Sequence, residues 1–183
     1  AGPDVVLRED PLQYVDAATD ELDPDRTHYV LGRIHQTVTS LTVRVNWTIS
    51  PHLAIQAYAQ PYLAALRYDE LKDVERPAAD RYADRFTLLD SALSTVDGGY
   101  VVSTPDARYR FARPDRNVRE LHSTLVARWE YRPGSTVFAI WSHGQTTNQL
   151  TGGELALGRD LRTLVNAGSE DIVMIKVNYW IGL

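Results

Sequence analysis

The sequence predicts an all-β protein built as an antiparallel up-and-down meander. Segments of alternating apolar and polar residues recur along the chain, and this period of two is typical of strands with one apolar side. The connections between these segments are either very short or very long. The chain ends on DIVMIKVNYWIGL, in which one side is apolar without a break. Together these observations favour the C-terminal part of a transmembrane β-barrel with long extracellular loops.

The composition is that of a globular chain with an acidic balance. The chain has 183 residues, of which 44% are hydrophobic, and a formal net charge of −5. An acidic chain argues against a general nucleic-acid or anionic-lipid binder, which needs an excess of Lys and Arg on one face. The absence of cysteine excludes disulfides and leaves the compartment open. No run approaches a membrane helix and the first residues are not a signal peptide, so the protein is either cytoplasmic or processed.

The first strand pair is predicted at residues 41–68. In SLTVRVNWTIS every second residue from Leu41 to Ile49 is apolar, and LAIQAYAQPYLAALRY continues the alternation after the turn residues SPH. The pattern predicts a β-hairpin.

A second hairpin and a terminal strand follow at residues 118–145 and 171–183. VRELHSTLVARWEYR and STVFAIWSHGQ flank the turn at Pro133 and Gly134. Most of the five predicted strands have roughly 10 residues or more, whereas soluble strands commonly have about 5 to 6. The longer value suits a tilted strand that crosses a bilayer, which needs about 9 to 11 residues.

The loops are unequal in length. The turns near Pro51 and Gly134 are very short, whereas residues 69–117 and 145–171 form two long connections. The first long connection contains a small hairpin candidate in GYVVSTPDARYRF, and the second contains a possible short helix in RDLRTLVN. Short turns at one end and long loops at the other are typical of transmembrane barrels.

Four aromatic residues on the apolar side of the strands lie close to a short turn or to the end of the chain. At one height in a barrel they would form a girdle at the periplasmic interface. The alternative is that they are core aromatics of a soluble sandwich. The predicted girdle residues are Trp47, Trp129, Tyr131 and Tyr179.

The polar side of the same strands would line the lumen of the barrel. Its charged groups either pair across neighbouring strands or form, with tyrosine rings as stacking surfaces, a path for sugars or anions. The predicted lumen-lining residues are Arg44, Asn46, Gln56, Tyr58, Gln60, Tyr62, Arg128, Glu130, Lys176 and Asn178.

The last residues suggest an assembly signal. In hydrocarbon no water can satisfy an open edge, so the strands of a barrel must close and the outward residues of the last strand must face lipid. Tyr179, Ile181 and Leu183 share the apolar side, and this pattern resembles the C-terminal signal by which bacterial outer-membrane barrels are recognised. The usual terminal residue there is Phe, from which Leu183 differs.

Parts of the sequence resemble a bacterial family of unknown function. Three parts of the chain are similar to the barrel portion of the domain-of-unknown-function 5916 family: THYVLGRIHQTVTSLTVRVNWTISPHLAIQAYAQPYLAALRY, LVARWEYRPGSTVFAIWS, and LGRDLRTL with IVMIKVNYWIGL. The resemblance covers roughly residues 27–183, and RWEYRPGST is its most specific piece. It implies a longer protein with a secretion signal, a module similar to family 9 carbohydrate-binding modules and an outer-membrane barrel. It implies no catalytic residues.

Strand arithmetic adds to this expectation. Five strands, or six if HYVLGRIHQ counts, fall short of the about eight that a transmembrane barrel needs. We therefore expect residues 27–183 to be the C-terminal strands of a barrel whose N-terminal remainder is another chain or segment. The acidic, proline-containing residues 1–26 are expected to be a loop remnant or an N-terminal extension.

Candidate catalytic and metal-binding residues are few. Ser142–His143 and His122–Ser123 suggest a hydrolase, but adjacent strand residues point to opposite faces, so neither pair forms a nucleophile and base within itself. A Ser and a His on the same side at one height would favour that function. The acidic residues of the first long loop lack the spacing of a calcium loop, so we expect neither a metal nor a cofactor.

The sequence thus predicts a non-enzymatic barrel of the bacterial outer membrane, which serves as a channel or as an anchor associated with a glycan-binding module. Its expected partners are outer-membrane lipid, the remainder of the barrel and other envelope proteins, and no nucleic acid. Two alternatives are an outer-membrane hydrolase and a soluble lipocalin-like ligand-binding barrel. The long loops and the apolar last strand disfavour the lipocalin alternative.

Overall fold

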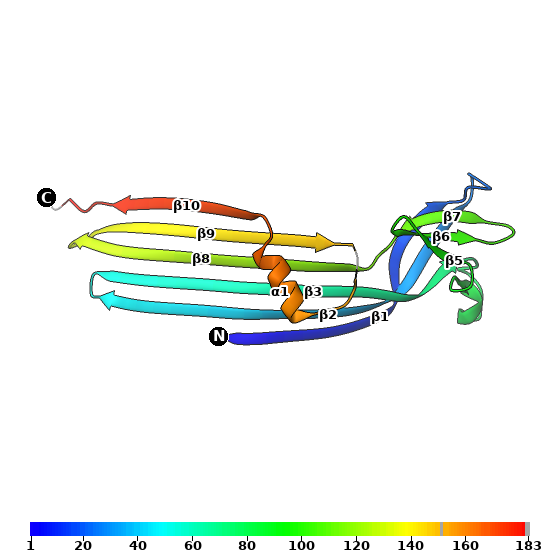
Figure 1. Cartoon of the computed structure of the whole chain (residues 1–183), viewed down its shortest axis with the longest axis horizontal. Coiled ribbons are helices and arrows are strands. Elements are labelled where there is room, and N and C mark those ends of the chain that lie inside the picture. The colour runs from blue at the N-terminus through cyan, green and yellow to red at the C-terminus, as the bar shows by residue number, and fades with distance from the viewer. Residues whose placement is uncertain (151, 182–183) are drawn as a thin grey trace.

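The computed structural model, which describes residues 1–150 and 152–181, is dominated by one seven-stranded antiparallel sheet (Figure 1). Strands that follow one another in the chain are neighbours in this sheet, apart from an insertion between β3 and β8. This confirms the predicted all-β meander. The order is β1 (Gly2–Thr19), β2 (Thr27–Ser50), β3 (Leu53–Val74), β8 (Arg116–Arg132), β9 (Ser135–Gln149) and β10 (Ser169–Asn178), and β4 (Phe86–Leu88) pairs with β3.

All five predicted strands are present, and the hairpin strands are longer than expected. β2 has 24 residues and β3 has 22, because the alternation continues beyond the segments that the sequence singled out. The terminal strand is shorter than predicted, because β10 ends at Asn178 and does not include Tyr179 and Ile181. The β8–β9 turn contains Gly134 with φ +76°, a left-handed conformation that glycine adopts without steric cost. A Cβ atom at Gly134 would also lie 3.1 Å from the side chain of Trp180.

The first residues of the chain form a strand rather than a loop. β1 pairs with β2 along almost its whole length, from Gly2 opposite Thr42 to Thr19 opposite Thr27. Its apolar alternation is weak, and the register shifts between Asp10 and Gln13, where Pro11 has no N–H to donate. β1 is an edge strand in the described residues, and an edge tolerates proline, so the acidic and proline-containing composition does not make this segment a loop.

The two long connections are largely structured. β3 continues into the first of them, and the rest holds η1 (Tyr82–Arg85), β4 and a three-stranded sheet of β5 (Leu93–Val96), β6 (Gly99–Ser103) and β7 (Arg108–Ala112). The predicted hairpin in GYVVSTPDARYRF is β6–β7. The second connection holds α1 (Leu157–Val165), which begins two residues before the predicted helix.

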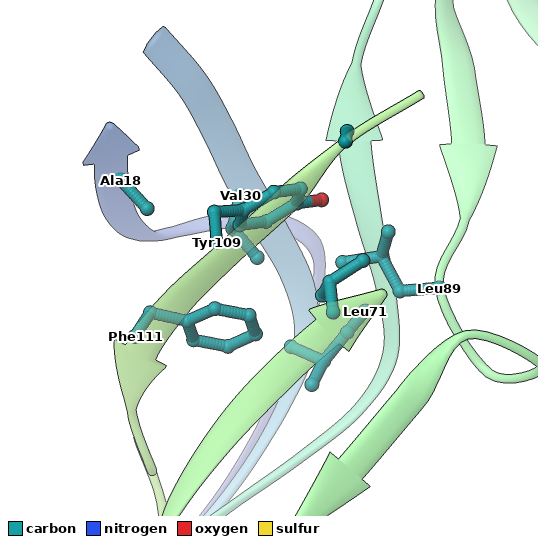
Figure 2. Packing of buried hydrophobic residues seen from close by; sticks show 8 residues of the cluster. Ala18, Val30, Leu71, Leu89, Tyr109 and Phe111 are labelled. Atoms are coloured by element: carbon teal, nitrogen blue, oxygen red, sulfur yellow. The ribbon is translucent and has the colours of Figure 1, made fainter. Parts of the chain in front are cut away.

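The main hydrophobic core lies away from the hairpin turns, where the ends of β1, β2 and β3 meet the small sheet (Figures 1 and 2). We call this part the distal region. A backbone hydrogen bond joins the long strands to the small sheet, since the N–H of Glu21, just after β1, donates to the carbonyl of Arg108 in β7 at 2.6 Å. The buried cluster consists of Ala18, Val30, Leu71, Leu89, Val102, Ala107, Tyr109 and Phe111.

A polar cluster is buried beside this core. The His28 ring stacks on Tyr109 with centroids 4.0 Å apart, and its two nitrogens contact the carboxylates of Asp20 and Asp73. The backbone N–H groups of Arg108 and Leu22 donate to Asp20 and lower its pKa to about 2. Burial next to Asp73 raises the pKa of Tyr109.

The main sheet is open. Within residues 1–150 and 152–181 no pairing joins β1 to β10, so both are edge strands. Strand β10 has no buried residue, and Val173 and Ile175 are each 70% exposed. The outward-facing residues predicted on β2 behave similarly: Leu41 and Val45 are exposed, whereas Val43 is half-buried.

Candidate functional site

The register divides the main sheet into two chemically different faces. One row across the strands contains Val45, Ala57, Leu125, Trp141 and Val173, and we call the side that carries it the apolar face. The adjacent row points to the opposite side, which we call the polar face, and contains Arg44, Tyr58, Thr124, Ser142 and Ile172. Because side chains alternate along each strand, the register places all the predicted lumen-lining residues on the polar face.

The polar face carries an open hollow of about 510 Å³ near the middle of β8 and β9. Gly144 lies between His122 and Glu170 in one row, and a Cβ atom there would meet nothing within 4 Å. The missing side chain helps to open the hollow. Its polar lining includes His122, Thr124, Ser142, Thr146 and Glu170.

A second hollow of about 180 Å³ adjoins the first, since Thr124 lines both. Predicted lumen residues gather here: the Arg44 guanidinium lies 5.5 Å from the centroid of the Tyr58 ring, in cation–π range. The Tyr58 hydroxyl donates to Gln60 Oε1 at 2.7 Å. Asn46 and Gln56 complete the polar lining.

The predicted lumen cations differ in their partners. Arg128 lies 3.8 Å from Glu130, two residues along the same strand. Among the described residues, neither Arg44 nor Lys176 has a carboxylate within 4.0 Å. Of these three cations, only Arg128 is therefore explained by pairing with a carboxylate. Of the remaining predicted residues, Asn178 donates to Thr136 at 3.3 Å, and Tyr62 lies opposite Ser40 and Glu120.

The predicted girdle residues lie at the end of the sheet with the short turns. Trp47 and Trp129 occupy neighbouring rows of the apolar face and are exposed, and the Trp129 and Tyr131 rings lie 6.0 Å apart. Tyr179 and Ile181 follow the last paired residue of β10 and are also exposed. Leu183, the last residue of the predicted assembly signal, lies outside the described residues.

An ion pair that the sequence analysis missed holds α1 on the apolar face, beyond the exposed aliphatic rows. Arg119 Nη2 lies 2.8 Å from Asp160 Oδ1, and both side chains are at most 2% exposed. Burial alone would raise the pKa of Asp160, but hydrogen bonds from the Ala156 N–H and Arg119 lower it overall. The signal was present: Arg119 breaks the apolar alternation of Leu121 and Leu125.

Other kinds of site are not found in the described part of the chain. No group of three or more His, Asp or Glu side chains there is arranged to hold a metal ion.

None of the helices that the structure describes is long and apolar enough to span a membrane.

Searches of protein-family models, of curated proteins and of solved structures find no match to this chain. The resemblance to the domain-of-unknown-function 5916 family therefore stays a prediction.

Proposed function

We propose that the meander is part of the wall of a bacterial outer-membrane β-barrel, with its apolar face in lipid and its polar face toward the lumen. The observation that carries the proposal is the exposure of the apolar face: Val173, Ile175 and Val177 are 60% exposed or more, and no second sheet covers them within the described residues. A large exposed apolar surface marks an interaction site. Strands can span lipid only in a closed barrel.

The asymmetry of the two ends supports one orientation. The short β2–β3 and β8–β9 turns lie at the end that carries Trp47 and Trp129, as periplasmic turns beside an aromatic girdle would. The 24 residues of β2 span roughly 80 Å at about 3.3 Å per residue, far more than a bilayer needs. The distal region would then stand outside the cell.

The two open edges define the first partner. A bacterial barrel needs an even number of strands and at least about eight. Strands from another segment or chain would therefore pair with β1 and β10 and close the wall. The remaining partners are lipid, a glycan-binding module for which the barrel is the anchor, and other envelope proteins.

The polar face supports a path for solutes rather than a reaction. Arg44 and Lys176 offer charges that no described carboxylate neutralises, and Tyr58 offers an aromatic surface in the second hollow. Cations with aromatic rings suit sugars and anions.

Fractionation of cells that produce the protein tests the membrane location. Outer membranes are washed with sodium carbonate at pH 11, which strips peripheral proteins and leaves integral ones. We expect the protein to remain in the pellet and to be released only by detergent. Recovery in the cytoplasmic fraction or in the carbonate wash would overturn the proposal.

A further inference from the structure

Three polar side chains form a row across neighbouring strands on the apolar face. Ser123 of β8 lies directly opposite His143 of β9, which lies directly opposite Asp171 of β10. His143 Nδ1 lies 2.8 Å from Asp171 Oδ1. This row is the first one beyond Leu125, Trp141 and Val173, so it stands at the upper edge of the exposed aliphatic rows.

The Asp171 carboxylate is fixed by two further donors. Trp141 Nε1 donates to Oδ1 at 2.8 Å, and the Ser169 hydroxyl donates to Oδ2 at 3.1 Å. A carboxylate that accepts a hydrogen bond from Nδ1 selects the imidazole tautomer in which Nε2 is a free base. Among the described residues, Nε2 of His143 has no hydrogen-bond partner.

Ser123 is placed to use that base. Its Oγ has one weak contact, 3.5 Å from the backbone carbonyl of His143, so the hydroxyl is free to turn. Side chains directly opposite each other in an antiparallel pair have Cβ atoms about 4.5 to 5.5 Å apart. In the described residues the hydroxyl contacts the backbone carbonyl and not the ring, so it must turn from that carbonyl to meet Nε2. Ser123 and His143 thus lie on the same side of the sheet at one height, as a nucleophile and its base must. The adjacent pairs Ser142–His143 and His122–Ser123 point to opposite faces and do not meet this condition.

An apolar groove of about 250 Å³ lies along the same face. Ser123 lies opposite Ala59, and the next row in the direction of α1 contains Leu121 and Pro61, of which Pro61 lines the groove. The groove is closed on one side by α1, which the buried Arg119–Asp160 pair holds in place. The other lining residues are Pro3, Thr39, Ser40, Leu41, Leu63, Leu157 and Leu161. Such a groove suits a hydrocarbon chain.

We infer that Ser123 and His143 are a nucleophile and a general base that hydrolyse acyl esters, that Asp171 is the positioning residue for His143, and that the groove beside α1 takes the acyl chain. The substrate class is a long-chain ester of an outer-leaflet lipid, and this choice rests on the membrane location proposed above. The row would then lie at the level where lipid ester groups meet the apolar part of the membrane.

The reaction balances without a cofactor. Ser123 Oγ attacks the ester carbonyl while His143 Nε2 takes the hydroxyl proton, and the bond to the alcohol oxygen breaks as that oxygen leaves with the proton. Water then gives a proton to Nε2 and attacks the acyl carbon, the bond between that carbon and Ser123 Oγ breaks, and Oγ takes the proton back from Nε2. The products are a free carboxylic acid, an alcohol and the regenerated serine.

An alkyl fluorophosphonate, which forms a covalent bond with activated serines, tests the nucleophile. The full chain is labelled in detergent and the modified residue is located by mass spectrometry. We expect the label on Ser123, its complete loss in Ser123→Ala, and unchanged labelling in Ser103→Ala, a control at an exposed serine of β6. A wild-type protein without label, or equal labelling of Ser123→Ala, would overturn the inference.

Two further variants test the base and the positioning residue. His143→Gln should slow labelling by about 10²- to 10⁴-fold, the usual effect of losing a general base, while His52→Gln in the β2–β3 turn leaves it unchanged. Asp171→Asn should lower kcat at least tenfold for 4-nitrophenyl octanoate and leave KM unchanged, because it misorients the base without touching substrate. Equal rates in all of these variants would show that the row is not catalytic.

Further controls distinguish a loss of catalysis from misfolding of a variant and from a failure of the proposed membrane location. Each variant is compared by circular dichroism, and Ser123→Cys, which nearly preserves the size of the serine side chain, must also lose the fluorophosphonate label. The assay is performed in detergent, so a failure of the membrane location does not alter its result. A preference for 4-nitrophenyl octanoate over the acetate, lost when Leu161→Asp fills the groove with a charge, supports the acyl-chain site, and equal rates on both esters would contradict it.

Discussion

The distal region buries its apolar side chains, whereas the end of the same sheet that carries the short β2–β3 and β8–β9 turns, the hairpin end, exposes them. The distal region buries apolar side chains from three long strands and a small second sheet, as a water-soluble domain does. The hairpin end has no second layer among the described residues, and its aliphatic side chains are exposed. The same strands run through both parts, so the difference lies in which other elements of the chain cover each part and not in strand propensity. The two parts should therefore respond oppositely to the same kind of substitution.

The largest effect is expected in the distal core. Phe111 is buried in the cluster between the two sheets, and Phe111→Ala should lower the free energy of unfolding of the distal region by about 3 to 5 kcal/mol. The matched control Leu22→Ala removes an exposed leucine near the same core and should cost less than about 0.5 kcal/mol. Urea unfolding monitored by tyrosine fluorescence measures both. Equal costs would mean that Phe111 is not packed as described.

The Arg119–Asp160 pair should stabilise the docking of α1 by about as much free energy as Phe111 stabilises the distal core. Asp160→Ala leaves the Arg119 guanidinium buried without a partner, which costs about 3 to 5 kcal/mol. Hydrogen exchange of the α1 amides should accelerate accordingly. Arg162→Ala, which removes an exposed charge from the same helix, serves as the control. The double variant Arg119→Met with Asp160→Leu should recover most of the protection of the α1 amides against exchange. Its failure to do so would show that the pair does more than neutralise a buried charge.

A pair of neighbouring substitutions distinguishes the two faces of β10. Ile175→Lys should cost about 2 to 4 kcal/mol in lipid, the range for a lysine near the middle of the membrane on the lipid face. Met174→Lys makes a similar change one residue away on the polar face and should cost little. Refolding into lipid vesicles compares the two stabilities. An equal loss of stability in the two variants would contradict the assignment of one face of β10 to lipid and the other to the lumen.

The pH dependence of the distal region follows from Asp20. Its folded pKa of about 2 lies below its ordinary value of 3.8, so the folded state favours the ionised carboxylate. This stabilisation is complete above about pH 4 and is lost as the pH falls through 3.8 toward 2. Unfolding of the distal region should become easier over that interval in the wild type. Asp20→Asn should flatten the dependence there, and an unchanged slope would contradict the assignment.

The smallest change in stability is expected at the end of the chain. Leu183→Asp should alter folding energy by only about 0 to 1 kcal/mol, since charges near the membrane interfaces cost little. If the terminal residues form an assembly signal, the amount of protein in the outer membrane should nevertheless fall strongly. Quantitative immunoblotting of outer membranes measures this, and normal abundance would refute the signal.

The sequence predicted the elements of this fold better than the contacts between them. The period of two and the turn residues located both hairpins, and RDLRTLVN located α1. β1 was missed because its alternation is weak and interrupted near Pro11, so that only its partner β2 makes it a strand. The structure of the first long connection depends likewise on packing between distant segments, as at Phe111 in the distal core.

The row of Ser123, His143 and Asp171 shows why a site of this kind cannot be read from alternation alone. The tight turn pairs Arg132 with Ser135, and continuing that register would place Thr124 opposite His143. An irregularity between Glu130 and Arg132 shifts the register by one residue and brings Ser123 into that position. The third member comes from a strand beyond a long connection, whose register no local rule sets.

The most direct test of the central claim is a cysteine scan along β10, because the chain contains no other cysteine. Residues 173–177 are replaced one at a time in the protein in outer membranes, and each thiol is labelled with an environment-sensitive fluorophore. Lipids that carry a nitroxide quencher should quench the labels at Val173, Ile175 and Val177, whereas a water-soluble quencher should act on those at Met174 and Lys176. Alternation with a period of two is the result that we predict, and equal access of the water-soluble quencher to all five positions would contradict it.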